Sequence, residues 1–324
     1  VVTAPGEGIV AGSEPFVVTR GYLLQRFMQA CAGRGGAPIK FNGSIFTVDA
    51  TSAYDADYRR WGPCYWWQNT RLPYLSMCAS GDFEMVRPLF RMYVDDLLGL
   101  HVWRTHLYTG HRGAFLPECM LFWGPTFAAT YGWTPFEERG EDKLQESGWH
   151  KREWVSGLEL VWMMLDWWEH TQDPAFARDT LIPAARVFVG FFAEHYPRDE
   201  RGKLVMEPSQ ALETWWDCTN PMPEVAGLHA VTARLLALPE DLTLEWNRRA
   251  WTNLRDALPD LPTREVDGAR MLAPAERFAD KRNVENPELY AVFPFRRVTF
   301  ATPDVELGRR ALEARWDRGA SGWR

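Results

Sequence analysis

The chain has 324 residues, a formal net charge of −7, and 46% hydrophobic residues. A chain of this length and apolarity can bury one large core or two modest ones. Its arginines and lysines form no basic run, and nucleic-acid binding needs a concentrated cationic face, so we expect no nucleic-acid partner. Charges or prolines interrupt every apolar stretch before it reaches the length of a membrane span.

Cysteine and histidine spacing favours no metal or redox site. The five cysteines are scattered without a CxxC pair, which is more typical of small buried hydrophobic residues. His101, His106 and His111 follow one another at intervals of five, so they do not share a helix face as a metal-binding pair would. No phosphate-binding or dinucleotide-binding motif is present. We therefore expect no metal and no cofactor.

The start of the chain, VVTAPGEGIVAGSEP, has no basic segment followed by an apolar run, so it does not read as a signal peptide. In chain order, residues 1–40 predict a linker or helical region, and residues 41–324 predict one catalytic domain. Strand-like alternation is limited to short pieces at residues 40–48 and 204–206. Apolar residues at spacings of three and four predict helices over residues 83–108, 156–170, 175–196, 225–238 and 242–258.

Four segments between or beside these helices combine acids, amides and aromatic residues: residues 59–75, 113–125, 207–224 and 280–296. The third is the most informative, because it holds four carboxylates and the adjacent Trp215 and Trp216. An indole can pack on the C–H face of a sugar while carboxylates bind its hydroxyls or move protons. A buried turn, with core indoles and helix-capping acids, is the alternative for such a motif taken alone.

Helical hairpins whose long loops gather at one end are typical of an α/α toroid. A weak internal sequence similarity between residues 103–115 and 167–176 supports repeated hairpins. The predicted fold class is therefore all-α with few short strands, and an α-solenoid without a cleft is the alternative. We expect the loops at Asn69, Glu118 and Glu213, together with Glu288, to meet at one end.

The segments WWQNTRLPYL, GAFLPE, LDWWEHTQDPAF, PSQALETWWDCTNPMPE and ENPELYAVFPF resemble the helical-toroid domain of glycoside hydrolase family 95 proteins, in particular an uncharacterised bacterial branch. The resemblance extends from about Lys40 to the C-terminus. It implies an (α/α)6 barrel of the six-hairpin type, inverting hydrolysis of α-L-fucosides or α-L-galactosides, and a periplasmic or extracellular location. The chain is short for six hairpins, and its last residues lead from a helix into a loop, so we expect the toroid to be incomplete at the C-terminus.

The same resemblance implies roles for particular residues. Glu213 takes the place of the general acid, Asn69 that of an amide that holds the attacking water, and Asp280 that of the aspartate supporting it. The family's Asn-x-Asn motif corresponds to Trp67, Gln68 and Asn69, so its first asparagine is lost, and three histidines of the family are replaced at positions 283, 285 and 288. These changes would alter which sugar fits. The predicted substrate-binding residues are Trp66, Trp67, Gln68, Arg71, Glu118, Trp215, Trp216, Asp217, Asn220, Glu224, Glu285, Asn286 and Glu288.

Several acids are candidates for a base that acts directly on water: Glu118, Asp217, Glu224, Glu285 and Glu288. The sequence thus predicts an inverting glycoside hydrolase acting on an oligosaccharide or polysaccharide of plant or host origin, and leaves the oligomeric state open. A polysaccharide lyase on the same fold, using Tyr65, Tyr74 or Tyr290 to remove a proton, is one alternative. A glycan-binding or scaffold protein without catalysis is the other.

Overall fold

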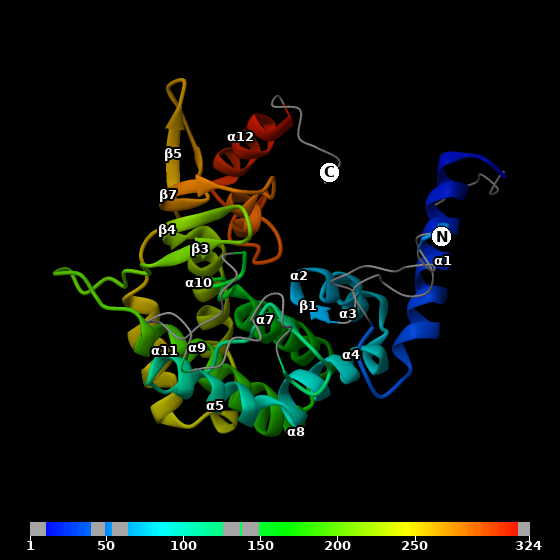
Figure 1. Ribbon diagram of the computed structural model, residues 1–324, viewed down its shortest axis with the longest axis horizontal. Coiled ribbons are helices and arrows are strands. Elements are labelled where there is room, and N and C mark those ends of the chain that lie inside the picture. Colours follow the sequence, from blue (N-terminus) through cyan, green and yellow to red (C-terminus); the bar gives the residue numbers. More distant parts are fainter. Residues whose placement is uncertain (1–10, 40–48, 54–63, 126–136, 138–148, 317–324) are drawn as a thin grey trace.

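The computed structural model describes residues 11–39, 49–53, 64–125, 137 and 149–316. In this part of the chain, helices form most of the structure, and strands form three small antiparallel sheets of two, three and two strands. Figure 1 shows the larger sheet and the β5–β6 hairpin stacked at one end of the helical layer. The prediction of an all-α (α/α)6 toroid is therefore wrong, because the fold mixes helices with sheets.

Helix α7 (Val155–Thr171) lies at the centre of the helical layer (Figure 1). Most of its side chains are buried on every side, as expected for a helix whose sequence is apolar all round. Helices α9 (Ile182–His195) and α10 (Met222–Leu236) pack against it. Each contact involves a glycine: a Cβ on Gly157 of α7 would lie 2.9 Å from Phe188 Cδ1 of α9, and a Cβ on Gly227 of α10 would lie 3.0 Å from Leu158 Cδ1 of α7. Glycines on α7 and on α10 thus set how closely these helices approach one another.

The other helices are α1 (Glu14–Gly33), α2 (Trp67–Thr70), α3 (Met77–Ser80), α4 (Phe83–Phe90), α5 (Leu98–Thr109), α8 (Pro174–Phe176), α11 (Glu245–Asp256) and α12 (Val305–Trp316). Tighter 3-10 turns are η1 (Leu72–Ser76), η5 (Glu240–Leu242) and η6 (Pro287–Ala291), and wider π turns are η2 (Arg91–Asp96) and η4 (Ala177–Leu181). All five predicted helices are confirmed, although π turns interrupt the first and third. The spacing of apolar residues predicts a helical course, but it does not distinguish a π turn from an α turn.

The strands pair as β1 (Tyr65–Trp66) with β2 (Cys119–Met120), as β3 (Ser209–Ala211) with β4 (Trp215–Pro221) and β7 (Ala275–Lys281), and as β5 (Thr263–Val266) with β6 (Ala269–Leu272). Strand β4 lies between β3 and β7, in the register Trp215↔Lys281 and Thr219↔Arg277. Residues 207–224, predicted to be a loop, therefore contain the central strand of the larger sheet. Of the predicted strands, residues 204–206 contribute only an isolated bridge from Leu204 to Arg198, and residues 40–48 lie outside the described residues.

The sequence between Thr214 and Thr219 explains this difference. Tryptophan and threonine favour strands, and here they outweigh the acids and prolines that indicated a loop. The two prolines mark the next boundary instead: Pro221 ends β4, and Pro223 lies in the first turn of α10, where its missing N–H leaves no helical bond unmade.

Helix α1 stands at the edge of the molecule, away from α9 and α11 (Figure 1). Its second half is attached to the start of α4, where Arg26 Nε donates to Asp82 Oδ2 at 3.0 Å and Gly33 packs against Ile39 and Met85. Its outer side leaves several apolar side chains exposed, including Phe27. Neither α1 nor any other helix in the described part of the chain is long and apolar enough to cross a membrane.

The glycine contact between α7 and α9 can be tested by comparing two glycines. Gly157→Ala would place a methyl group against Phe188, and overpacking of this kind costs about 1–3 kcal/mol of unfolding free energy. Gly190→Ala, in the middle of α9 and with open space around its Cα, should instead stabilise by about 0.5–1 kcal/mol. Urea unfolding of both variants measures the difference. Equal changes in the unfolding free energy of the two variants would show that Gly157 is not needed for the close approach of α7 and α9.

Candidate active site

Six glutamates gather around the N-terminal end of α7, and we call them the glutamate cluster: Glu118, Glu153, Glu159, Glu213, Glu224 and Glu285. The pairing of β1 with β2 brings the first of them into place. The N–H of Gln68 donates to Glu118 Oε1 at 2.7 Å, and Ser156 Oγ donates to Glu118 Oε2 at 3.1 Å. Sequence segments predicted as separate loops therefore meet at α7.

Arg71 supplies a buried positive charge at the base of this cluster. Its Nε donates to Glu159 Oε1 at 2.9 Å, and its Nη2 donates to the Tyr290 hydroxyl at 2.6 Å. The indole of Trp67 donates to the other oxygen of Glu159, with Nε1–Oε2 at 2.6 Å. These contacts join α2, α7 and η6, so Arg71 and Trp67 support the cluster from within the core.

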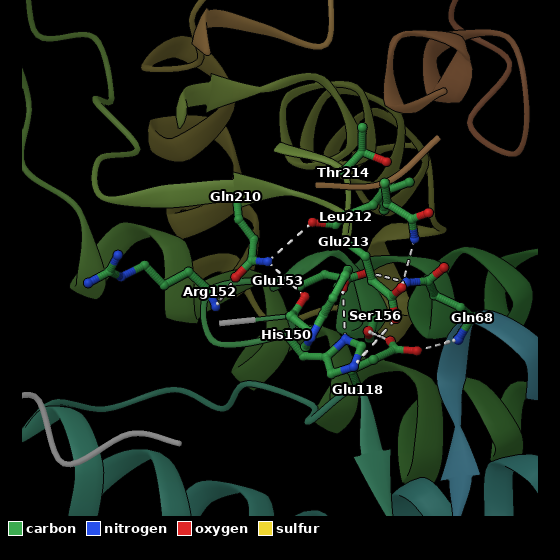
Figure 2. A network of polar contacts seen from close by, with 12 residues as sticks. Gln68, Glu118, His150, Arg152, Glu153, Ser156, Gln210, Leu212, Glu213 and Thr214 are labelled. Carbon is green, nitrogen blue, oxygen red and sulfur yellow. Dashed lines mark hydrogen bonds and ion pairs between the residues drawn. The ribbon is translucent and has the colours of Figure 1, made fainter. Parts of the chain in front are cut away.

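Glu213 lies just before β4 and makes its contacts at the centre of the polar network in Figure 2. Its Oε2 accepts a hydrogen bond from Asn283 Nδ2 at 2.9 Å, and its Oε1 lies 3.4 Å from His150 Nε2. The hydroxyl of Thr214, the next residue, donates to Glu285 Oε2 at 3.1 Å. Glu213 and Glu285 are thereby brought close together from two different segments.

The turn that carries His150 is held against β3 by Gln210 (Figure 2). Gln210 Oε1 accepts the N–H of Arg152 at 2.8 Å, and Gln210 Nε2 donates to the carbonyl of Trp149 at 2.8 Å. The imidazole of His150 is buried, and its Nδ1 lies 3.5 Å from Glu153 Oε2. His150 is thus placed between two glutamates of the cluster.

Exposure separates Glu213 from most of the cluster. Its side chain is 26% exposed, whereas Glu118 and Glu153 are 1% exposed. Burial raises the pKa of Glu213 to about 7, the nearby Glu285 carboxyl adds to the rise, and the Asn283 hydrogen bond lowers it. Burial, together with the neighbouring carboxyls, raises the pKa of Glu118 and of Glu153 well above the ordinary range. Glu213 is therefore a carboxyl that solvent can reach and that titrates near neutral pH.

Glu285 and His150 complete the electrostatics around Glu213. Burial raises the pKa of Glu285, but the Thr214 hydroxyl and the charge of Arg71 lower it, so these two favour the ionised form. Burial lowers the pKa of His150 to about 3, which leaves the ring neutral at physiological pH. A neutral ring has one N–H donor and one acceptor nitrogen.

Partly exposed indoles border Glu213. Trp66 packs edge-on against His150 with ring centroids 5.1 Å apart, and Trp216 packs in the same way on Trp149 at 4.9 Å. The Trp216 indole also donates to the carbonyl of Glu213, with Nε1–O at 2.9 Å. Of the four predicted stacking tryptophans, Trp67 is fully buried and belongs to the core. Trp215 packs against Phe278, on the sheet.

Several predicted site residues lie elsewhere or act in the framework. Asp280 is exposed at the end of β7 and forms an ion pair with Arg282, with Oδ1–Nε at 2.6 Å. Asp217 is exposed on β4, and Asn220 accepts the N–H of Met206 at 2.8 Å. The charged neighbours of Glu288 include Arg264, Lys281 and Arg315. Asn69 lies in α2 beside Gln68, and Asn286 precedes η6.

Glu224 has a structural role at the back of the cluster. It lies in the first turn of α10, and its Oε1 accepts the N–H of Trp154 at 3.2 Å, at the start of α7. A carboxyl oxygen in this position satisfies an N–H at the start of the helix that has no partner within the helix. It thus matches the helix-capping alternative for the acids of residues 207–224.

Sequence reasoning missed His150 and Glu153, and it assigned Asn283 no role beyond the replacement of a family histidine. One signal was available: Glu153, Ser156 and Glu159 follow at intervals of three at the start of an otherwise apolar helix, so they share one face. Their polar side chains all point into the cluster through the contacts given above. No comparable pattern marks His150, whose position depends on the turn that carries it.

The candidate lyase bases are poorly placed. Tyr65 and Tyr74 are buried and bound to backbone groups, and burial raises the pKa of both. Tyr290 is buried and bound to Arg71. Among the residues that the structure describes, no group of three or more His, Cys, Asp and Glu is arranged to hold a metal ion. A cavity of about 470 Å³ lies apart from the cluster, between the end of α1 and the start of α4.

Comparison of the chain with models of known protein families gives no match, and comparison with curated proteins gives none either. What the site can do must therefore be argued from its own residues.

The burial of Glu224 predicts a dependence of stability on pH. Burial raises the pKa of Glu224 to about 8, so the folded protein keeps this proton while the unfolded chain ionises above about pH 4.3. The unfolding free energy should therefore fall between pH 4.3 and 8, by up to about 1.4 kcal/mol per pH unit from this residue. Glu224→Gln, which keeps an acceptor oxygen for Trp154, should make the fall shallower in denaturant unfolding. Parallel curves for both proteins would contradict this role.

Proposed function

We propose that the protein is a glycoside hydrolase in which Glu213 is the general acid and Glu285 the general base. The observation that carries the proposal is the pair itself: two partly exposed carboxyls, held close together, with pKa values that burial raises in both, and of which Glu285 also has the charge of Arg71 to favour its ionised form. Neighbouring carboxyls with different surroundings can take the roles of acid and base in one site. The resemblance in sequence to inverting hydrolases supports the same reaction, with an oligosaccharide or polysaccharide as substrate.

Glu213 suits the acid because its proton is available near neutral pH. A general acid works best when its pKa lies close to the working pH, and that of Glu213 is raised to about 7. Solvent reaches this carboxyl, and two indoles lie beside it. A glycosidic oxygen placed between them would receive the proton as the bond to the sugar breaks.

Glu285 suits the base better than the other candidates do. Glu118 is buried, Glu224 caps α7, Asp217 is exposed on the sheet, and Glu288 has other charged neighbours. Glu285 is half-buried, and its charge is one cause of the raised pKa of Glu213, so ionised Glu285 keeps the acid protonated. In an inverting reaction the two carboxyls are about 6.5–9.5 Å apart, with the attacking water next to the base.

The acid role of Glu213 can be tested by comparing leaving groups. Glu213→Gln removes the proton but preserves the size of the side chain, so hydrolysis of an ordinary glycoside should fall by about 10²–10⁴. A glycosyl fluoride or nitrophenyl glycoside needs less protonation and should be partly spared. A panel of such substrates, with product configuration followed by NMR, measures both the rate and inversion. Full activity of Glu213→Gln on unactivated glycosides would exclude this acid.

The indoles should contribute to binding unequally. Trp216→Ala removes a partly exposed indole next to Glu213 and should weaken oligosaccharide binding by roughly 1–3 kcal/mol, the scale of one aromatic contact. Trp215→Ala is the control, since this neighbouring indole packs on Phe278 instead. Isothermal titration with substrate analogues distinguishes them. Equal losses would mean that the sugar does not stack at Trp216.

A further inference from the structure

His150 connects the proposed acid to a second, buried glutamate. Its Nε2 lies 3.4 Å from Glu213 Oε1, and its Nδ1 lies 3.5 Å from Glu153 Oε2. Glu153 is 1% exposed and His150 is 4% exposed, so bulk water does not reach the contact between them. Figure 2 shows the ring of His150 between the two side chains.

Two polar atoms at this contact require a shared proton. His150 Nδ1 and Glu153 Oε2 face one another, and in the described part of the chain neither has another hydrogen-bond partner. A buried polar atom left unpaired costs about 1–3 kcal/mol. One proton between them would satisfy both, and it can belong either to the carboxyl or to the ring.

The choice between these positions is tied to the state of Glu213. If Glu153 carries the proton, Nδ1 accepts it and Nε2–H donates to ionised Glu213. If Nδ1 carries it, Nε2 is an acceptor and only protonated Glu213 can donate to it. Both arrangements contain the same number of protons, so they differ only by an internal transfer.

We propose, on the basis of the function proposed above, that Glu153 stores a proton which His150 delivers to Glu213. The Glu153 O–H proton moves to Nδ1 while the Nε2 proton moves to Glu213 Oε1. Negative charge passes from Glu213 to Glu153, and no proton enters or leaves the site. His150 and Glu153 are then positioning residues, because they act on the substrate only through Glu213.

The surroundings determine the direction of this transfer. Glu118, Glu224 and Glu285 face Glu153 from three other segments, and their carboxyls oppose a charge on it. Gln68 Nε2 lies 3.4 Å from Glu153 Oε1 and can stabilise that charge, and the charge of Arg71 also interacts with Glu153. In the free protein, once the pH exceeds the pKa of Glu213, the charge therefore stays on the more exposed Glu213. A bound sugar would cover Glu213, make its charge unfavourable, and draw the stored proton onto it.

The proposal predicts that the acid remains usable above its own pKa. In the wild type, the fall in activity at high pH (the basic limb of the pH profile) should report the loss of the last proton shared by Glu153, His150 and Glu213. Its apparent pKa belongs to these three groups together. In His150→Gln and in Glu153→Gln no proton can be delivered, so the limb should fall to the pKa of Glu213 alone, about 7. We expect the wild-type limb in kcat/KM to lie about one pH unit or more above both variants, which should keep most of their activity near pH 6.

The controls are a second histidine and a second glutamate outside this network, His195→Gln and Glu194→Gln, which should leave the basic limb in place. The double variant His150→Gln/Glu153→Gln should match the single variants, since either change breaks the same chain. Loss of activity by the same factor at every pH, with the limb unmoved, would mean that these residues only hold Glu213 in place and would overturn the storage role.

A measurement on the wild type keeps the test independent of the stability of the variants. Nitrogen-15 NMR of the ligand-free protein at pH 8 should show the His150 proton on Nε2, with Nδ1 accepting from Glu153. A proton on Nδ1 at that pH would overturn the proposal. The outcomes also separate the two proposals: if Glu213→Gln is inactive and the limb is unmoved in the His150 variant, only the storage role fails. If Glu213→Gln is fully active, the proposed function fails.

Discussion

The ion pair between Arg71 and Glu159 is the interaction on which the rest of the site depends. Helix α7 is buried on every side, so the carboxylate of Glu159 near its start has no access to water. Arg71 offsets that charge and also reaches the Gln68 carbonyl and the Tyr290 hydroxyl, which joins three distant segments. Removing one partner of such a pair typically lowers the unfolding free energy by about 3–5 kcal/mol, because the other charge stays buried without compensation.

This pair also explains why neutral carboxyls collect around it. One guanidinium cannot compensate six glutamates, so the members that burial isolates most completely hold their protons instead of ionising. At Glu213, which water still reaches, the balance between the protonated and ionised forms falls near neutral pH. The framework and the proposed chemistry therefore have the same physical origin.

The sequence predicts the helices well because their apolar spacing is local. It also predicts that the loops at Asn69, Glu118, Glu213 and Glu288 meet at one end. It does not predict the larger sheet, since pairing between β4 and β7 joins residues far apart in the chain. Asp280 shows the same limit: resemblance assigns it to the site, yet the end of β7 turns it toward Arg282 and solvent. The stripe of Glu153, Ser156 and Glu159 was readable in advance, whereas His150 was not, because its place depends on a turn fastened by Gln210.

Strand β4 and helix α10 form an unbroken connection between Glu213 at one end and Glu224 at the other. Inserting one residue into β4 would reverse the faces of its side chains after that point. It would also turn Glu224 by about 100° around α10, away from Trp154. The number of residues between these two glutamates is therefore fixed by the site, whereas the turn of the β5–β6 hairpin can change in length. Chains that share this site should vary in length at the hairpin and not between Glu213 and Glu224.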